Sequence, residues 1–162
     1  MLTLKGLARR RGDDEEGFTL IELMVVVLII AILIAIAIPT FLGARQRAQD
    51  RAAQSDLRNG LTAEKTYYTD GQTYATAAQM TASNIETSLN WGGAITTKPA
   101  LHVTVSTDTL SVCLDEASKS GTVFSLLDIS SGATAGTYYG KAACGAVPNS
   151  GGAVPAGFTG TW

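Results

Sequence analysis

The chain has 162 residues, of which 46% are hydrophobic and only 16% are charged. An average soluble domain carries about 25% charged residues, and the apolar content here excludes intrinsic disorder. The formal charge of −2 gives no excess of Lys and Arg, which argues against a general nucleic-acid binder. Two cysteines are too few for a disulfide-dense miniprotein or a four-ligand zinc module.

The apolar residues are concentrated in residues 18–38, and residues 23–38 contain no polar side chain. As a helix, residues 18–38 would span about 31 Å, close to the hydrocarbon thickness of a bilayer. So small a domain could not cover such a helix as a buried core element. A cleaved secretory signal is disfavoured because no small-residue cleavage site follows the run. We therefore predict a membrane-spanning helix whose basic flank, Arg9 to Arg11, stays in the cytoplasm while the C-terminal domain lies outside.

One carboxylate, Glu22, lies inside this apolar segment. An ionised carboxylate at the centre of a membrane helix costs roughly 2.5–3.5 kcal/mol, and less near the interface. Glu22 could simply extend toward the lipid head groups, or it could serve a cationic partner in apolar surroundings. We favour the second interpretation because acids within membrane segments are usually functional.

The segment Gly17-Phe18-Thr19-Leu20-Ile21-Glu22, with the apolar run behind it, resembles the signature of type IV prepilins. That signature is a glycine, then Phe-Thr-Leu-Ile-Glu, then about twenty apolar residues. The match covers residues 17–39 closely. The resemblance implies an α+β fold, in which a long N-terminal helix with a protruding apolar half packs on a four-stranded antiparallel β-sheet.

The same resemblance implies roles for individual residues. A membrane prepilin peptidase cuts family members after the glycine, here Gly17, and the new N-terminal residue, here Phe18, is then N-methylated. The family's glutamate corresponds to Glu22 and its mid-helix proline to Pro39, both implied in assembly. Cleavage exposes a cationic amine on Phe18, and in a bundle of parallel helices Glu22 of a neighbouring subunit can neutralise it.

The sequence divides into six expected segments. They are a cytoplasmic leader that is removed (1–17), the transmembrane and filament-core half of the helix (18–39), its amphipathic half (40–68), a helix-to-sheet connecting loop (69–100), an antiparallel sheet with a disulfide loop (101–144) and a C-terminal surface tail (145–162).

The amphipathic half is rich in helix-forming residues, and its charges alternate in sign, as on a solvated helix. Two apolar stripes follow a spacing of three to four residues. We expect the stripe that begins at Phe41 to contact neighbouring subunits, and the later stripe to pack against the chain's own domain. The later stripe consists of Ala53, Leu57, Leu61 and Tyr68. An ordinary amphipathic helix with an imperfect stripe is the alternative.

After Pro99 apolar and polar residues alternate with a period of two, which predicts strands. The expected strands are residues 101–105, 110–114, 121–129 and 137–144, and Thr76 to Thr81 are expected to add a short helical turn. Four short strands with short links indicate an antiparallel meander laid over the second half of the long helix.

Cys113 and Cys144 fall in the part expected to lie outside the cytoplasm, where a disulfide is the favoured state. Two free buried thiols are the alternative. The single histidine, His102, is expected to be an ordinary sheet residue rather than a catalytic one. Four acids could bind a cation only if loops bring them together, and they follow no EF-hand pattern, so no metal site and no cofactor are expected. They are Asp108, Asp115, Glu116 and Asp128.

The leading hypothesis is a structural subunit, a major type IV pilin that polymerises through its N-terminal helix into an extracellular filament. Its implied partners are other copies of itself, the prepilin peptidase, the pilus assembly machinery and, before assembly, membrane lipid. It would begin as a single-pass protein of the cytoplasmic membrane and end in a pilus on the cell surface. The sequence does not distinguish adhesion, motility, DNA uptake or electron transport.

Three other classes of protein are alternatives to the pilin. A major pseudopilin of a type II secretion system uses the same N-terminal helix, but the resemblance implies that such proteins often rely on calcium and lack a disulfide. Cys113 and Cys144 therefore favour the pilin. A monomeric membrane-anchored extracytoplasmic binding protein would not need Glu22. An enzyme is least favoured because no nucleophile elbow, P-loop or zinc-ligand spacing is present.

Overall fold

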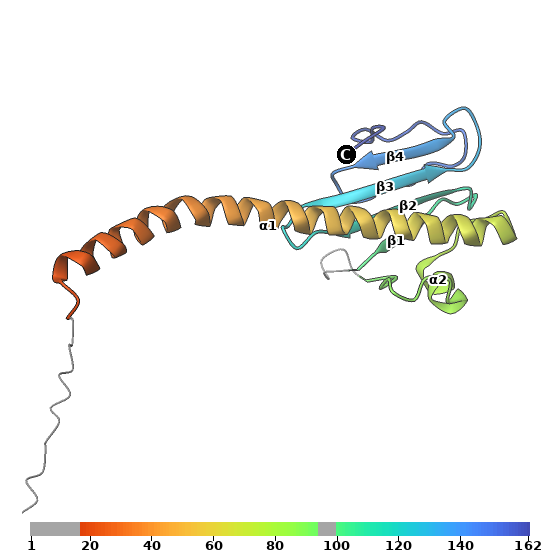
Figure 1. The fold of residues 1–162 in the computed structure, drawn as a ribbon. Helices are drawn as coiled ribbons and strands as arrows, with labels where there is room; N and C mark the ends of the chain where they lie inside the picture. The colour runs from red at the N-terminus through yellow and green to blue at the C-terminus, as the bar shows by residue number, and fades with distance from the viewer. Residues whose placement is uncertain (1–16, 94–99) are drawn as a thin grey trace, which may run out of the picture. The chain divides into compact units, whose positions relative to one another are not determined.

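The computed structural model describes residues 17–93 and 100–162. The expected leader therefore lies outside the described residues, apart from Gly17. The chain divides into two compact units, Met1–Phe41 and Leu42–Trp162. Its elements, in chain order, are helices α1 (Leu20–Gly71) and α2 (Ala77–Ser83) and strands β1 (His102–Val105), β2 (Ser111–Ala117), β3 (Val123–Ile129) and β4 (Gly136–Gly140) (Figure 1). The expected α+β fold, a long apolar N-terminal helix with a four-stranded antiparallel sheet, is confirmed.

Helix α1 continues without a break through Pro39. Proline has no N–H to donate to the helix, and the next residue, Thr40, donates its hydroxyl to the carbonyl of Ile36 at 3.0 Å. The helix ends three residues later than the sequence predicted. Gln72 adopts a left-handed conformation with φ of 54° and donates its backbone N–H to the carbonyl of Tyr68 at 2.7 Å, which closes the last turn.

The sheet is the expected antiparallel meander, with strand order β1-β2-β3-β4. Six of the eight strand ends lie within two residues of the predicted ones, and two differ by more. β2 extends three residues past Leu114 because Asp115, Glu116 and Ala117 continue the pairing with β3. β4 ends at Gly140, before the residues that lead to Cys144. The sequence did not predict the end of β2 because two of its last residues are the acids Asp115 and Glu116, and acids are depleted from strands in general.

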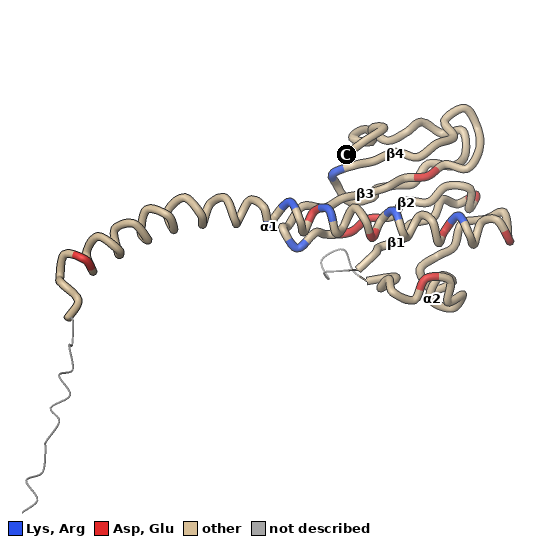
Figure 2. The backbone as a smooth tube through the Cα atoms, in the orientation of Figure 1, with Lys and Arg blue, Asp and Glu red and all other residues tan. Residues whose placement is uncertain are grey.

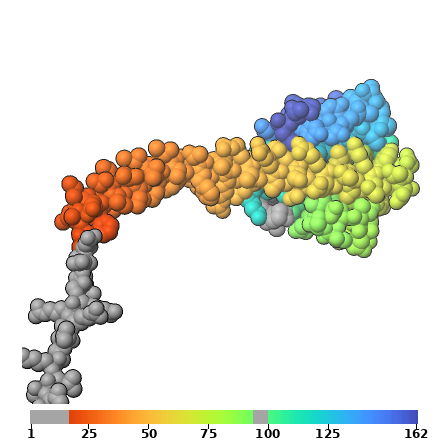
Figure 3. Space-filling model, in the orientation of Figure 1, coloured from red at the N-terminus to blue at the C-terminus, as the bar shows by residue number. Residues whose placement is uncertain are grey.

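The part of α1 within Leu42–Trp162 packs along one face of the sheet (Figure 1). The later apolar stripe carries this contact, as the sequence predicted. Ala53, Leu57 and Leu61 are buried in one cluster with side chains from β2 and β3. Those partners are Val112, Leu114, Phe124 and Leu126. Figure 3 shows the same helical segment in contact with the rest of this unit along its length.

The opposite face of the sheet is covered by the chain that follows β4. Cys113, Leu127 and Ile129 form a second cluster, and Phe158 packs against it together with Val147 and Val154. The disulfide between Cys113 and Cys144 joins this covering segment to β2. β2 is therefore buried along its whole length on both faces. The tail expected on the surface is in this structure the outer layer of the sheet.

The last residue of the sequence, Trp162, holds the end of this covering segment against the sheet. Its indole N–H lies 3.1 Å from the carbonyls of both Ser125 and Gly140. Its ring packs edge-on against Tyr139, with centroids 4.6 Å apart, and the guanidinium of Arg58 on α1 lies 4.8 Å over it. Aromatic contacts of this kind, with a cation on the ring face, are worth about 0.5–1.5 kcal/mol each.

A buried acid, Asp115, links the disulfide to the edge of the sheet. Its carboxylate accepts the backbone N–H of Cys144 at 2.5 Å, and its other oxygen lies 3.1 Å from Nδ1 of His102. Burial raises the pKa of Asp115, and these contacts oppose the rise. His102 thus occupies a strand position beside an acid.

Glu64 of α1 is fully buried, although the sequence placed it on a helix with a solvated charge pattern. One carboxyl oxygen accepts the backbone N–H of Ala75 at 3.0 Å and so ties the loop after α1 to the helix. The other oxygen has no hydrogen-bond partner among the described residues. Burial raises the pKa of Glu64 to about 7, with the bond from Ala75 acting in the opposite direction.

This burial predicts a pH-dependent stability. Between the ordinary pKa of 4.5 and about 7, the unfolded chain loses the Glu64 proton while the folded chain keeps it, so stability falls as pH rises through this window. Glu64→Gln should reduce that fall by roughly 1–3 kcal/mol between pH 5 and pH 8. Urea unfolding of the full chain in detergent at both pH values measures it. Glu86→Gln, in the loop after α2, is the matched control and should not reduce the fall. An unchanged slope in Glu64→Gln would contradict the interpretation.

A second prediction concerns Gly60, which is buried where α1 crosses the sheet. A Cβ at this position would lie 2.4 Å from Leu101 Cδ2 and 3.2 Å from Leu114 Cδ1, both in the core. Gly60→Ala should therefore destabilise the unit by about 1–3 kcal/mol, although alanine is the better helix former. Gly43→Ala, where the new methyl group meets only Arg47 at 3.4 Å, should instead stabilise by about 1 kcal/mol. Thermal unfolding followed by circular dichroism compares them, and equal shifts would contradict the packing argument.

Candidate functional site

The first part of α1 presents an apolar surface on every side. Eighteen large hydrophobic side chains, from Phe18 to Leu42, are 46–82% exposed. Figure 2 shows this stretch as almost free of charge, with a single acidic position near its start. Within the described ranges, α1 is the one helix long and apolar enough to cross a membrane. Full burial of such side chains is worth roughly 1.5–3 kcal/mol each, so this surface requires a lipid or protein environment.

The acidic position is Glu22, and its side chain closes the beginning of the helix. One carboxyl oxygen accepts both the backbone N–H of Thr19 at 2.9 Å and its hydroxyl at 2.6 Å. The Thr19 hydroxyl in turn accepts the backbone N–H of Glu22 at 3.3 Å. This reciprocal arrangement is a capping box, in which a Thr before the first helical residue pairs with a Glu three positions later.

The capping role was not predicted from the sequence, although Thr-x-x-Glu before an apolar run is its signature. The box fixes the point where the helix starts and holds the carboxylate of Glu22 beside the backbone of Thr19. An acid there also interacts favourably with the positive end of the helix dipole. Glu22 therefore has a structural partner in the isolated chain, besides the intermolecular role implied by the resemblance.

The expected cleavage position lies directly before this box. Gly17 and Phe18 are both exposed and precede the helix, and a Cβ on Gly17 would meet nothing within 4 Å. The residues on both sides of the expected cleavage bond are thus exposed. Pro39, the other residue assigned to assembly, lies far along α1. The structure brings Thr19 and Glu22 together, and it leaves Pro39 apart from them.

The acids considered as cation ligands are mostly engaged with protein groups. Asp128 accepts hydrogen bonds from the hydroxyls of Tyr74 and Thr137 and lies 3.1 Å from the ammonium of Lys65. Asp115 binds Cys144 and His102 as described above. Among the described residues, no group of three His, Cys, Asp or Glu side chains is placed to hold a metal ion.

Comparison with known proteins points to the same end of the chain. Residues 13–38 match the family described as the prokaryotic N-terminal methylation motif. The type IV major pilin protein PilA of Myxococcus xanthus is 45% identical over 59 residues, which are 36% of this chain and 27% of that protein. The type IV wide pilus major component PilA4 of Thermus thermophilus is 37% identical over 59 residues, 36% of this chain and 45% of that protein.

A third relative comes from a secretion system. The type II secretion system core protein G of Escherichia coli is 35% identical over 77 residues, covering 48% of this chain and 53% of that protein. The chain thus spans between about a quarter and a half of the length of these relatives. No solved structure matches it significantly. The methylation motif, the apolar helix and these relatives support a type IV pilin-like protein, with the similarity confined to part of the chain.

Proposed function

We propose that this chain is a major pilin, the structural subunit of a type IV pilus. It is made as a single-pass protein of the cytoplasmic membrane, loses residues 1–17 to a prepilin peptidase and is N-methylated on Phe18. It then polymerises through α1 into an extracellular filament with the help of the membrane assembly machinery. The single observation that carries the proposal is the exposed apolar start of α1 directly behind the Gly17-Phe18 junction.

Glu22 gives the polymer its order in this proposal. After cleavage the Phe18 amine is cationic, and packing of apolar helices removes it from water. A buried charge without a partner costs several kcal/mol, so the amine must meet a carboxylate. Glu22 is the only acid between Phe18 and Phe41, and the neighbouring copy supplies it. The pair thereby selects one axial offset between neighbouring helices.

The second candidate is a major pseudopilin of a type II secretion system. The alignment with core protein G favours it, because those 77 residues extend well beyond the methylation motif. The disulfide and the engaged acids Asp115 and Asp128 favour the pilin, since they stabilise this fold with covalent and internal polar contacts. Electron microscopy of surface filaments with mass spectrometry of the subunit separates the two candidates.

The processing step is tested at Gly17. The mature subunit of sheared surface filaments should begin at N-methylated Phe18. Gly17→Val should leave the leader on and keep the chain in the membrane, because the branched side chain occupies space beside the bond to be cut. N-terminal mass spectrometry of both fractions measures this. Surface filaments that retain the leader would refute the proposal.

The role of Glu22 is tested by separating its charge from its capping function. Glu22→Gln keeps a side chain that can close the capping box but removes the negative charge. Filament yield should fall sharply, roughly tenfold or more, while membrane insertion and cleavage persist. Thr19→Ala removes the box at a cost of about 1 kcal/mol but keeps the charge, so assembly should continue.

The measurement compares the membrane pool with sheared filament for wild type and both variants. Normal filament yield from Glu22→Gln would show that the charge is not needed. Loss of filament in Thr19→Ala alone would mean that the helix start, rather than the charge, controls assembly.

A further inference from the structure

A cavity of about 330 Å³ lies within the unit Leu42–Trp162, between α1 and the end of β2. Four alanines form much of its wall, and their short side chains leave the space open. Asp56 of α1 and Glu116 of β2 supply two carboxyl groups to it, and Arg45 and Lys119 line it as well. No role assigned so far uses this cavity.

The buried carboxyl group of Glu116 distinguishes this cavity from a packing defect. It is only 2% exposed, and its Oε2 has no hydrogen-bond partner among the described residues. Burial raises its pKa to about 7, and the nearby Asp56 adds to the rise. A carboxylate in this position lacks the cation that would make its ionised form favourable.

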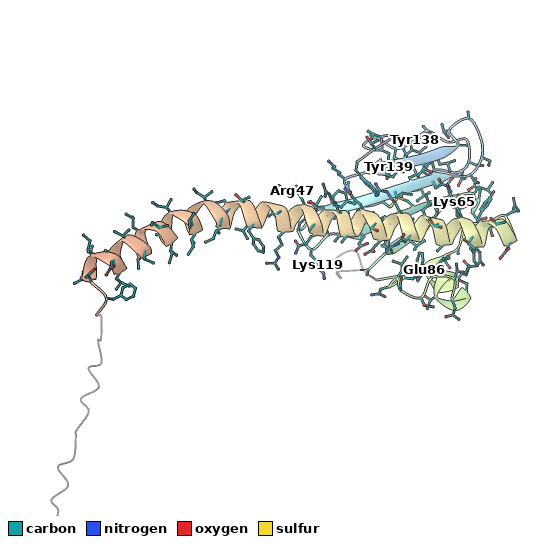
Figure 4. The ribbon with its side chains drawn as sticks, in the orientation of Figure 1. Arg47, Lys65, Glu86, Lys119, Tyr138 and Tyr139 are labelled. Carbon is teal, nitrogen blue, oxygen red and sulfur yellow. A yellow bond between two sulfur atoms is a disulfide. The ribbon has the colours of Figure 1, made fainter. Side chains whose placement is uncertain are left out.

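The basic residues around the cavity do not supply that cation within the chain. The ion pairs in the described part of the structure are Lys65 with Asp128 and His102 with Asp115. Arg45 and Lys119 line the cavity, yet neither lies within 4.0 Å of a described carboxylate. Arg47 and Arg51 of α1 are exposed and make no described ion pair either. Figure 4 labels Arg47 and Lys119 near the same stretch of α1.

We propose that this cavity receives the guanidinium group of Arg47 or Arg51 from α1 of a second copy of this chain, with Glu116 and Asp56 as acceptors. The inference rests on the proposed function, because a polymer of identical chains supplies the second copy. A guanidinium carries five N–H donors in a fixed plane and can serve two carboxylates at once. Its aliphatic stem suits an alanine-lined wall. A calcium ion takes six to eight oxygen ligands, and two carboxyl groups do not provide them.

Carbodiimide coupling tests the contact directly, since it joins an amine to an adjacent carboxylate. Arg47→Lys and Arg51→Lys each place an amine in the proposed site. Filaments grown from a mixture of ¹⁵N-labelled and unlabelled chains are coupled, digested and analysed by mass spectrometry. We expect a mixed-label peptide that joins Glu116 or Asp56 to the introduced lysine. The internal pair Lys65 and Asp128, 3.1 Å apart, should give same-label links and so reports that coupling works.

A charge variant gives the second readout. Glu116→Gln should lower filament yield roughly tenfold or more while the membrane pool stays folded, as judged by its resistance to limited proteolysis. Glu86→Gln removes the same charge from the loop after α2 and should match the wild type. Intact filaments with no mixed-label link at Glu116 or Asp56, or with Glu116 coupled only to its own Lys119, would overturn the inference alone. Absence of wild-type filaments would overturn the proposed function, and the inference with it.

Discussion

One constraint governs this protein: the apolar start of α1 has no packing partner among the described residues of its own unit. Every large hydrophobic side chain from Phe18 to Leu42 is exposed, so this part of the helix requires an apolar environment, either lipid or other apolar helices. In the filament proposed above, helices of identical chains would meet that requirement without exposing the surface to water. The capping box at Thr19 and Glu22 gives this helix a defined beginning, and in the proposed filament a defined beginning would allow many copies to align.

The unit Leu42–Trp162 has the opposite requirement. It must be stable in water with a small hydrophobic core. It does so in layers, with α1 on one face of the sheet and the chain after β4 on the other. The disulfide between Cys113 and Cys144, the acid Asp115 and the indole of Trp162 hold the second layer in place. Polar contacts and the disulfide therefore hold much of this second layer against the sheet, whose central strands are buried on both sides.

The elements that obey a regular period were predictable from the sequence. The helical spacing of Ala53, Leu57 and Leu61 identified the packed face of α1, and alternation identified the strands. Buried acids were not predictable from charge patterning. Glu64 lies three residues after Leu61, on the same stripe, so its position indicated burial while its charge suggested exposure. Glu116 is buried because β2 continues past its apolar run, which depends on pairing with a distant strand. The prepilin signature located Glu22, but the capping box was not predicted, although the spacing of Thr19 and Glu22 before the apolar run is its sequence signature.

The outer strands of the sheet affect how the protein behaves where many copies lie close together. β4 receives an extra partner, since Tyr139 and Thr159 exchange backbone hydrogen bonds of 2.7 and 2.9 Å. Beside β1, Leu101 does the same with the segment around Trp91, through bonds of 2.9 Å to Asn90 and Gly92. Unpaired strand edges invite pairing with other chains, and here short segments of the same chain occupy part of each edge. In the proposed filament, many copies could therefore lie at high local concentration while the sheets resist joining edge to edge, so that association would occur through the helices.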